Sequence, residues 1–220
     1  MSIHPHTFIE EIMLLALDDT TGALRPMPPM ALGYALAGAL LADLALHDRT
    51  DTDAKQLTVL DPTPTGDALL DRALATIVAS PAPQPVAHWL SVFSEERHLL
   101  ENAALERLVA NRILQKQEKK FLWVFGVRRY PTVDNTERTE VRTRLAALIL
   151  GQDLPDPRDA ILLSLLSACR LTQRIFPGPE FTARSERLAT LAKMDLVGRE
   201  VGSAIEEINR AMNSVVHLGM

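Results

Sequence analysis

Few residues in this chain of 220 have the types and spacing that catalysis requires. A metal site needs histidines, cysteines or carboxylates at set spacings, and the histidines here form no His-x-x-x-His pair. They are His4, His6, His47, His88, His98 and His217. The sequence also contains no glycine-rich phosphate loop and no G-x-S-x-G turn. These patterns predict neither a metal site nor a cofactor site.

Two further candidates for chemistry have simpler structural explanations. Asp18 and Asp19 are followed by Thr20, Thr21 and Gly22, a composition typical of a turn after a helix rather than of an acid–base pair. Cys169 lies in the apolar stretch LLSLLSACRL, which predicts a packed thiol and not a nucleophile. We therefore expect no catalytic residue, and a protein that is not an enzyme.

The strongest candidate for binding is a stretch that combines aromatic and basic side chains. Residues 113–130, ILQKQEKKFLWVFGVRRY, have the composition of two strands joined by a charged turn. Alternate residues of the second strand are apolar on both faces: Phe121, Leu122, Trp123, Val124, Phe125 and Val127. Such a strand is packed on its own helices, used as a contact between copies, or inserted into a membrane. The sequence leaves these three interpretations open.

Charge is concentrated around the same hairpin. Residues 112–144 contain nine basic and four acidic residues, which gives this segment a net charge of +5. Because the whole chain has a net charge of −5, the remaining residues together carry −10. Lys119, Lys120, Arg128 and Arg129 beside Trp123 would attract an anionic membrane reversibly. In the simpler alternative the charged turn is only solvated, and the helical residues Arg138 and Arg142 pair with Glu137 and Glu140.

Composition limits the remaining classes of protein. The net charge of −5 argues against a general nucleic-acid binder, and a single cysteine builds no disulfide framework. The first residues lack the pattern of a secretory signal, so we expect a cytoplasmic protein, peripheral at the membrane if lipid is its partner. The longest apolar run, Met30 to Leu46, reaches Asp43 too early for a membrane span and predicts a buried core helix.

The candidate residues must be positioned by helices, because proline clusters divide the chain into helix-sized intervals. A first helix carries Phe8, Ile12, Leu15 and Ala16 on one face and ends at DDTTG. Further helices are expected over 30–47, from Asp67 onward, and over 85–94, 95–111, 134–151, 157–175, 180–193 and 195–216. A short strand is expected over 55–60. The predicted fold is all-α, a single-domain helical bundle over residues 1–220 with one or two small β-hairpins, and residues 1–6 frayed.

Several blocks in fixed order resemble the Golgi phosphoprotein 3 family. They are EEIMLLALDDTTG (10–22), LAGALLADLAL (36–46), PTGDALLDRAL (64–74), VAHWLSVFS (86–94), ERLVANRIL (106–114) and FLWVF before Tyr130 and Pro131. The resemblance implies one mostly helical domain with a central bundle, surrounding amphipathic helices and a protruding β-hairpin. Eukaryotic members are peripheral proteins that bind phosphatidylinositol 4-phosphate at the Golgi, contact coatomer and glycosyltransferase tails, and self-associate through the hairpin. No catalysis is attributed to them.

The resemblance also implies a lipid headgroup pocket, made by one tryptophan and three arginines. These positions fall near Pro28 and at Ala37, Asn102 and Leu105, so all four residues are lost here. Arg107 and Arg112 lie nearby in the sequence as possible replacements. We therefore expect a bacterial-type member that keeps the scaffold without the family's headgroup residues.

The function expected from the sequence is that of a non-enzymatic peripheral membrane or adaptor protein. It would contact anionic lipid or partner proteins, but not nucleic acid, through a basic surface and an apolar strand. The basic surface would comprise Arg107, Arg112, Lys119, Lys120, Arg128 and Arg129, and the membrane or oligomer contact Phe121, Leu122, Trp123, Val124 and Phe125. The alternative is a soluble homo-oligomer that uses the hairpin as its self-association surface.

Overall fold

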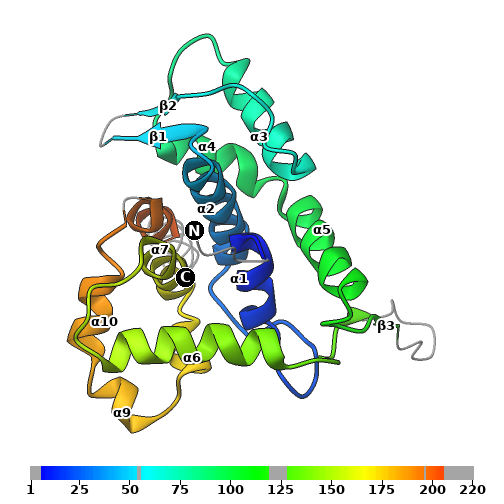
Figure 1. The fold of residues 1–220 in the computed structure, drawn as a ribbon, viewed down its shortest axis with the longest axis vertical. Coiled ribbons are helices and arrows are strands. Elements are labelled where there is room, and N and C mark those ends of the chain that lie inside the picture. The colour runs from blue at the N-terminus through cyan, green and yellow to red at the C-terminus, as the bar shows by residue number, and fades with distance from the viewer. Residues whose placement is uncertain (1–5, 54–55, 119–127, 196, 206–220) are drawn as a thin grey trace, which may run out of the picture.

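The computed structural model describes residues 6–53, 56–118, 128–195 and 197–205. Two buried helices, α1 (Phe8–Ala16) and α2 (Ala31–Leu46), form its centre (Figure 1). Five longer helices pack against one or both of them. These are α3 (Ala68–Val78), α4 (Val86–Ser94), α5 (Arg97–Ala110), α6 (Thr136–Leu150) and α7 (Pro157–Ala168). The predicted all-α fold is confirmed.

The central helix α2 is apolar on every side because neighbours surround it. It contacts α1, α3, α4, α5 and α7, and almost all of its side chains are buried. Gly38 permits the closest approach: a Cβ atom there would overlap with the side chains of Leu165 and Val201. Among the described helices, none combines the length and apolarity needed to cross a membrane. The run Met30 to Leu46 is therefore the core helix that the sequence predicts.

Helix starts follow the sequence signals closely. The Thr7 hydroxyl accepts from the Glu10 N–H and the Glu10 carboxylate accepts from the Thr7 N–H, a reciprocal cap for α1. The Asp67 carboxylate accepts from the N–H groups of Leu69 and Leu70 at the start of α3. These caps fix where the elements begin.

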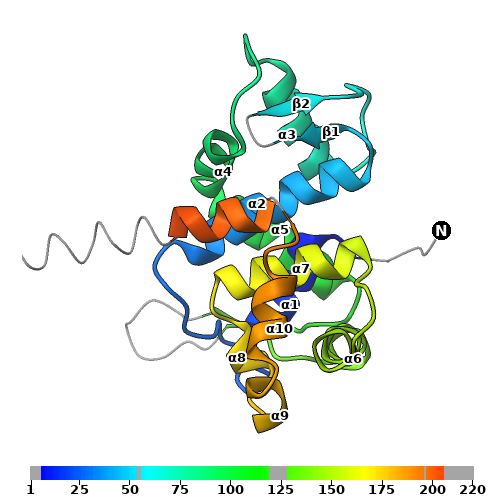
Figure 2. The ribbon, with the colours of Figure 1, turned by 90° about the vertical axis from the view of Figure 1, so that its left-hand side faces the viewer.

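The C-terminal third is more broken than the sequence predicts. The helix expected over 157–175 is wrong in extent, because Arg170 adopts a left-handed φ of 56° that ends α7 before the short α8 (Thr172–Ile175). The helix expected over 180–193 is likewise divided into α9 (Pro179–Thr182) and α10 (Ser185–Leu191). Residues 197–205 form a helix beside α2 (Figure 2), and the remainder of the span predicted to reach 216 lies outside the described residues.

Two small antiparallel hairpins complete the fold. β1 (Thr50–Thr52) pairs with β2 (Leu57–Val59), with Thr50 opposite Val59. Only the second of these strands was predicted, because the polar sequence of the first lacks a strand signature. β3 (Gln117–Glu118) pairs with β4 (Arg128–Arg129).

The described N-terminus is more ordered than the frayed segment that we predicted. His6 is buried, with Nδ1 3.5 Å from the Glu10 carboxylate and Nε2 3.4 Å from that of Glu137. The neighbouring carboxylates, Glu10 first, raise the pKa of His6 above its ordinary value. The expectation of fraying is therefore wrong at residue 6, and residues 1–5 lie outside the described part.

Candidate functional site

The base of the second hairpin is a paired stem at one edge of the molecule (Figure 1). Gln117 lies opposite Arg129, and Glu118 lies opposite Arg128. The pairing continues toward the body, where the Gln115 N–H donates to the Pro131 carbonyl at 3.0 Å. The described residues on either side of 119–127 therefore lie side by side, as a hairpin requires.

The loop after α1 holds this stem. The Tyr130 N–H donates to the Gly22 carbonyl at 2.9 Å, and the Arg129 guanidinium donates to the Thr21 carbonyl at 3.2 Å. Gly22 has a φ of 61°, and a Cβ atom there would overlap with the backbone of Tyr130 and Pro131. Only glycine combines that conformation with so close an approach. The loop is thus packed against the described stem of the hairpin.

The acidic pair in that loop has two different roles. The Asp18 carboxylate accepts from the Thr20 and Thr21 N–H groups at 3.2 and 2.9 Å, which confirms the predicted turn. These bonds, those from Thr21 first, lower the pKa of Asp18. Asp18 also lies 3.6 Å from Arg25, whereas Asp19 pairs both with Arg25 and with two arginines of α6.

Most of the predicted hairpin residues fall outside the described part of the chain. These are Lys119, Lys120, Phe121, Leu122, Trp123, Val124 and Phe125, together with the side chain of Arg128. Arg112 is exposed at the end of α5, with a φ of 61°, and Arg129 is half-buried. The geometry therefore fixes where the hairpin begins, and its role stays a prediction.

Arg107 is not available in the way that the sequence suggested. Its guanidinium contacts both oxygens of Asp67, with Nη2 at 3.0 Å from Oδ1, and lies 3.9 Å from Glu10. Burial raises the pKa of Asp67, but the hydrogen bonds from Arg107 and from the helix start outweigh it, so that this pKa lies below its ordinary value. Arg107 therefore binds the α3 cap, which removes one cation from the proposed basic surface.

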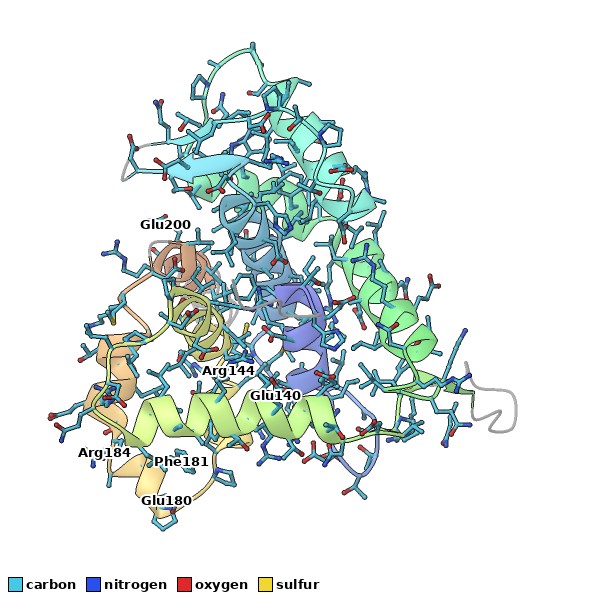
Figure 3. The ribbon with its side chains drawn as sticks, in the orientation of Figure 1. Glu140, Arg144, Glu180, Phe181, Arg184 and Glu200 are labelled. Carbon is cyan, nitrogen blue, oxygen red and sulfur yellow. The ribbon has the colours of Figure 1, made fainter. Side chains whose placement is uncertain are left out.

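The arginines of α6 also form ion pairs with carboxylates of the same chain. Arg138 is buried and donates to Asp19 at 2.7 Å, and Arg142 donates to the same carboxylate at 3.1 Å. Arg144 rises from α6 (Figure 3) to pair with Glu11 at 3.0 Å and with Asp159. The predicted pairing of Arg138 and Arg142 with Glu137 and Glu140 is therefore wrong.

A buried ionic cluster joins α1, α2 and α7, and sequence reasoning missed it. Arg158 donates to the His6 carbonyl at 2.6 Å and to Glu11 at 3.1 Å, and lies 3.9 Å from Asp43. The Asp43 carboxyl accepts from the Phe8 N–H at 3.0 Å. Burial raises the pKa of Asp43 to about 8, despite the opposing effect of Arg158. The sequence did contain a signal for this cluster, because Glu11 and Asp43 each lie within an apolar helix. A buried acid needs a partner, since an unpaired buried charge is costly.

The positions that the resemblance assigns to the headgroup pocket carry residue types other than tryptophan and arginine. Ala37 and Leu105 are buried, and Asn102 lines a cavity of about 400 Å³ together with His98 and Glu101. That cavity is lined by no lysine or arginine among the described residues. The loss of the headgroup arginines is thus not compensated within the cavity itself.

The one cysteine of the chain has a structural role. Cys169 is buried, its thiol donates to the Ala31 carbonyl at 3.3 Å, and burial raises its pKa to about 12. This confirms the predicted packed thiol. The described residues contain no group of three or more His, Cys, Asp or Glu residues arranged to hold a metal ion.

Comparison with known proteins agrees with the fold. The family model described as Golgi phosphoprotein 3 (GPP34) matches residues 8–208. A curated relative, vacuolar protein sorting-associated protein 74 of Eremothecium gossypii, is 26% identical over 170 residues, which cover 67% of this chain and 50% of the relative. The chain thus spans about half the length of that relative. Since the family match covers nearly all of the helical domain described above, the chain belongs to the Golgi phosphoprotein 3 family.

Proposed function

We propose that this chain is a non-enzymatic adaptor that attaches peripherally to anionic membranes through its β3–β4 hairpin. The observation that carries the proposal is the antiparallel stem, which brings Gln117 opposite Arg129 at the edge of the molecule. The intervening sequence KKFLWVFGV is rich in basic and aromatic residues. The family and the name of the relative, which refers to vacuolar protein sorting, support an adaptor role.

The cations available for this attachment lie in the hairpin rather than in α6. Arg107, Arg138 and Arg144 each pair with a carboxylate of the same chain. The remaining hairpin cations are Lys119, Lys120, Arg128 and Arg129. At ~1 kcal/mol for each cation near an anionic surface, the four would supply ~4 kcal/mol, enough for reversible binding.

The family's phosphatidylinositol 4-phosphate is the natural candidate lipid, but its selective recognition needs headgroup contacts. The aligned positions Pro28, Ala37, Asn102 and Leu105 carry no cation. Each lost hydrogen bond to a charged group is worth ~1.5–3 kcal/mol. We therefore propose attachment governed by surface charge, with weak preference among anionic lipids.

Vesicle flotation at low and high salt tests this proposal. The native chain should float with vesicles that contain phosphatidylserine at low salt and be released at high salt, because salt screens surface charge. Trp123→Asp and the fourfold replacement of Lys119, Lys120, Arg128 and Arg129 by Glu should each abolish flotation. A control with three charge reversals elsewhere replaces the exposed cations Arg184, Lys193 and Arg199 by Glu and should still float. Absence of flotation of the native chain at low salt refutes the proposal.

The second candidate function, self-association through the hairpin, makes a different prediction. The apolar strand Phe121 to Phe125 would bury its aromatic side chains between copies, each worth ~1.5–3 kcal/mol. Sedimentation would then show a concentration-dependent oligomer that Trp123→Asp converts to a monomer. A native chain that is monomeric at every concentration excludes this alternative.

A further inference from the structure

A groove separate from the hairpin lies between the loop before α2 and the short helix α8. Its volume is about 720 Å³. It is lined by Pro26, Met27, Pro28, Pro29, Arg170, Gln173 and Arg174. Pro28 lies near the position that the resemblance assigns to the headgroup tryptophan, whereas none of the headgroup arginine positions falls on α8 or at Arg170. The segments that form the groove are far apart in the sequence.

The groove is positively charged and locally uncompensated. Its lining includes two guanidinium groups and no carboxylate. Arg170 and Arg174 are exposed, and neither side chain forms an ion pair within the described part of the chain. Arg142 donates to the Ile175 carbonyl of α8 at 3.0 Å and also to Asp19. Asp19 is already shared by Arg25, Arg138 and Arg142.

The two walls of the groove are held in fixed positions. At the end of α7, the Arg170 N–H donates to the Ser167 carbonyl and the Leu171 N–H to the Leu166 carbonyl, both at 2.9 Å. This is a Schellman motif, and its left-handed position carries Arg170 where glycine is usual. The adjacent Cys169 thiol donates to the Ala31 carbonyl.

The opposite wall, which is the proline loop before α2, is anchored at Ala31, the residue that Cys169 contacts. The Ala31 N–H donates to the Pro28 carbonyl at 3.2 Å, so the proline loop is anchored where Cys169 contacts α2. Proline also restricts the conformations of the loop. A ligand would therefore lose little binding energy in ordering the backbone of either wall.

We propose that this groove binds a phosphate monoester, whether as a soluble metabolite or as a lipid headgroup. A guanidinium presents paired N–H donors that match two oxygens of a phosphate group. Two guanidinium groups in one groove favour a dianion over a single carboxylate, and the Gln173 amide adds a neutral donor. The inference is independent of the hairpin proposal, because it uses none of the hairpin residues.

Two substitutions remove the charge with little disturbance of the fold. Arg170→Gly places glycine at the left-handed position that favours it, so the helix end should be kept or slightly stabilised. Arg174→Gln keeps a long polar side chain in α8. Arg184→Gln is the matched control: Arg184 is exposed and lies at the start of α10, outside the lining of the groove (Figure 3).

Calorimetric titration with glycerol 3-phosphate tests the soluble source, and flotation with phosphatidic acid vesicles tests the lipid source. Phosphatidylglycerol vesicles of the same charge density serve as the comparison, because their phosphate is a diester. The proposal predicts binding to at least one monoester, with a loss of about ten- to a hundredfold for each arginine removed. Arg184→Gln should bind as the native chain does.

Binding of glycerol 3-phosphate that depends on Arg170 and Arg174 identifies a metabolite site. Arginine-dependent flotation with phosphatidic acid alone identifies a headgroup site. The proposal is overturned if neither probe binds, or if Arg170→Gly and Arg174→Gln bind as tightly as the Arg184→Gln control. Failure of the hairpin proposal remains distinguishable, since replacement of the hairpin cations should leave glycerol 3-phosphate binding unchanged.

Discussion

The buried carboxyl of Asp43 should make the protein less stable as the pH rises from acidic to mildly alkaline. In the folded chain the pKa of Asp43 is about 8, because burial disfavours its charged form. In the unfolded chain the pKa of this carboxyl has its ordinary value of 3.8. Between these two values the unfolded state releases a proton that the folded state keeps, so the free energy of unfolding falls as the pH increases.

The size of the effect follows from the difference between the two values. A difference of about four pKa units corresponds to ~5–6 kcal/mol once the pH exceeds 8, and ~4 kcal/mol of this is lost between pH 5 and pH 8. His6 acts in the same direction, because Glu10 raises its pKa and the stability that its charge provides is lost as the pH rises above that pKa. The groups with lowered pKa values, such as Asp18 and Asp67, act only at more acidic pH.

Asp43→Asn isolates the contribution of this one carboxyl. The amide carbonyl can accept from the Phe8 N–H as the protonated acid does, and the amide does not ionise. Urea unfolding at several pH values should give a variant whose stability depends less on pH than that of the native chain. The variant should exceed the native chain by several kcal/mol at pH 8, and by only ~1–2 kcal/mol at pH 5. The contribution of His6 is present in both proteins and cancels in this comparison.

Equal pH slopes for the two proteins would refute this reasoning. So would an Asp43→Asn variant that is less stable than the native chain at pH 8. Either result would mean that Arg158 keeps Asp43 ionised in the folded state, as a buried ion pair at 3.9 Å.

Three further predictions concern other parts of the fold. Gly22→Ala should lower the free energy of unfolding by ~2–3 kcal/mol in chemical denaturation, because Gly22 has a φ of 61° and no room for a Cβ atom; a loss below 0.5 kcal/mol would contradict the close packing of loop and hairpin. Arg138→Met should leave thermal stability unchanged or raised, because burial lowers the pKa of this arginine and its partner Asp19 remains partly solvated; a large destabilisation would show that the pair is needed for folding. The Cys169 thiol should react with a disulfide reagent only at the rate of unfolding, because burial raises its pKa to about 12; rapid labelling of the native chain would disprove its burial.

Local signals in the sequence determined most of the helices and their starts. Thr7, Asp67 and Asp156 are side chains that cap a helix through short-range hydrogen bonds, so the neighbouring residues suffice to predict them. The apolar run of α2 determined a core helix in the same way, because a helix that is apolar on all sides must be covered on all sides. The ordered motifs determined the family for the same reason, since they consist of neighbouring residues.

Pairing between distant residues was decided only by the tertiary structure. Arg138 meets Asp19 across 119 positions, and Arg144 meets Glu11 across 133, so no local pattern indicated that the basic segment is partly neutralised. The break at Arg170 is also tertiary, because the left-handed turn leads the chain from α7 to the buried Leu171. The periodicity of the sequence indicates which residues are apolar, but it does not indicate which charged side chains form ion pairs. The tertiary structure determines these pairs, because an unpaired charge is costly when it is buried.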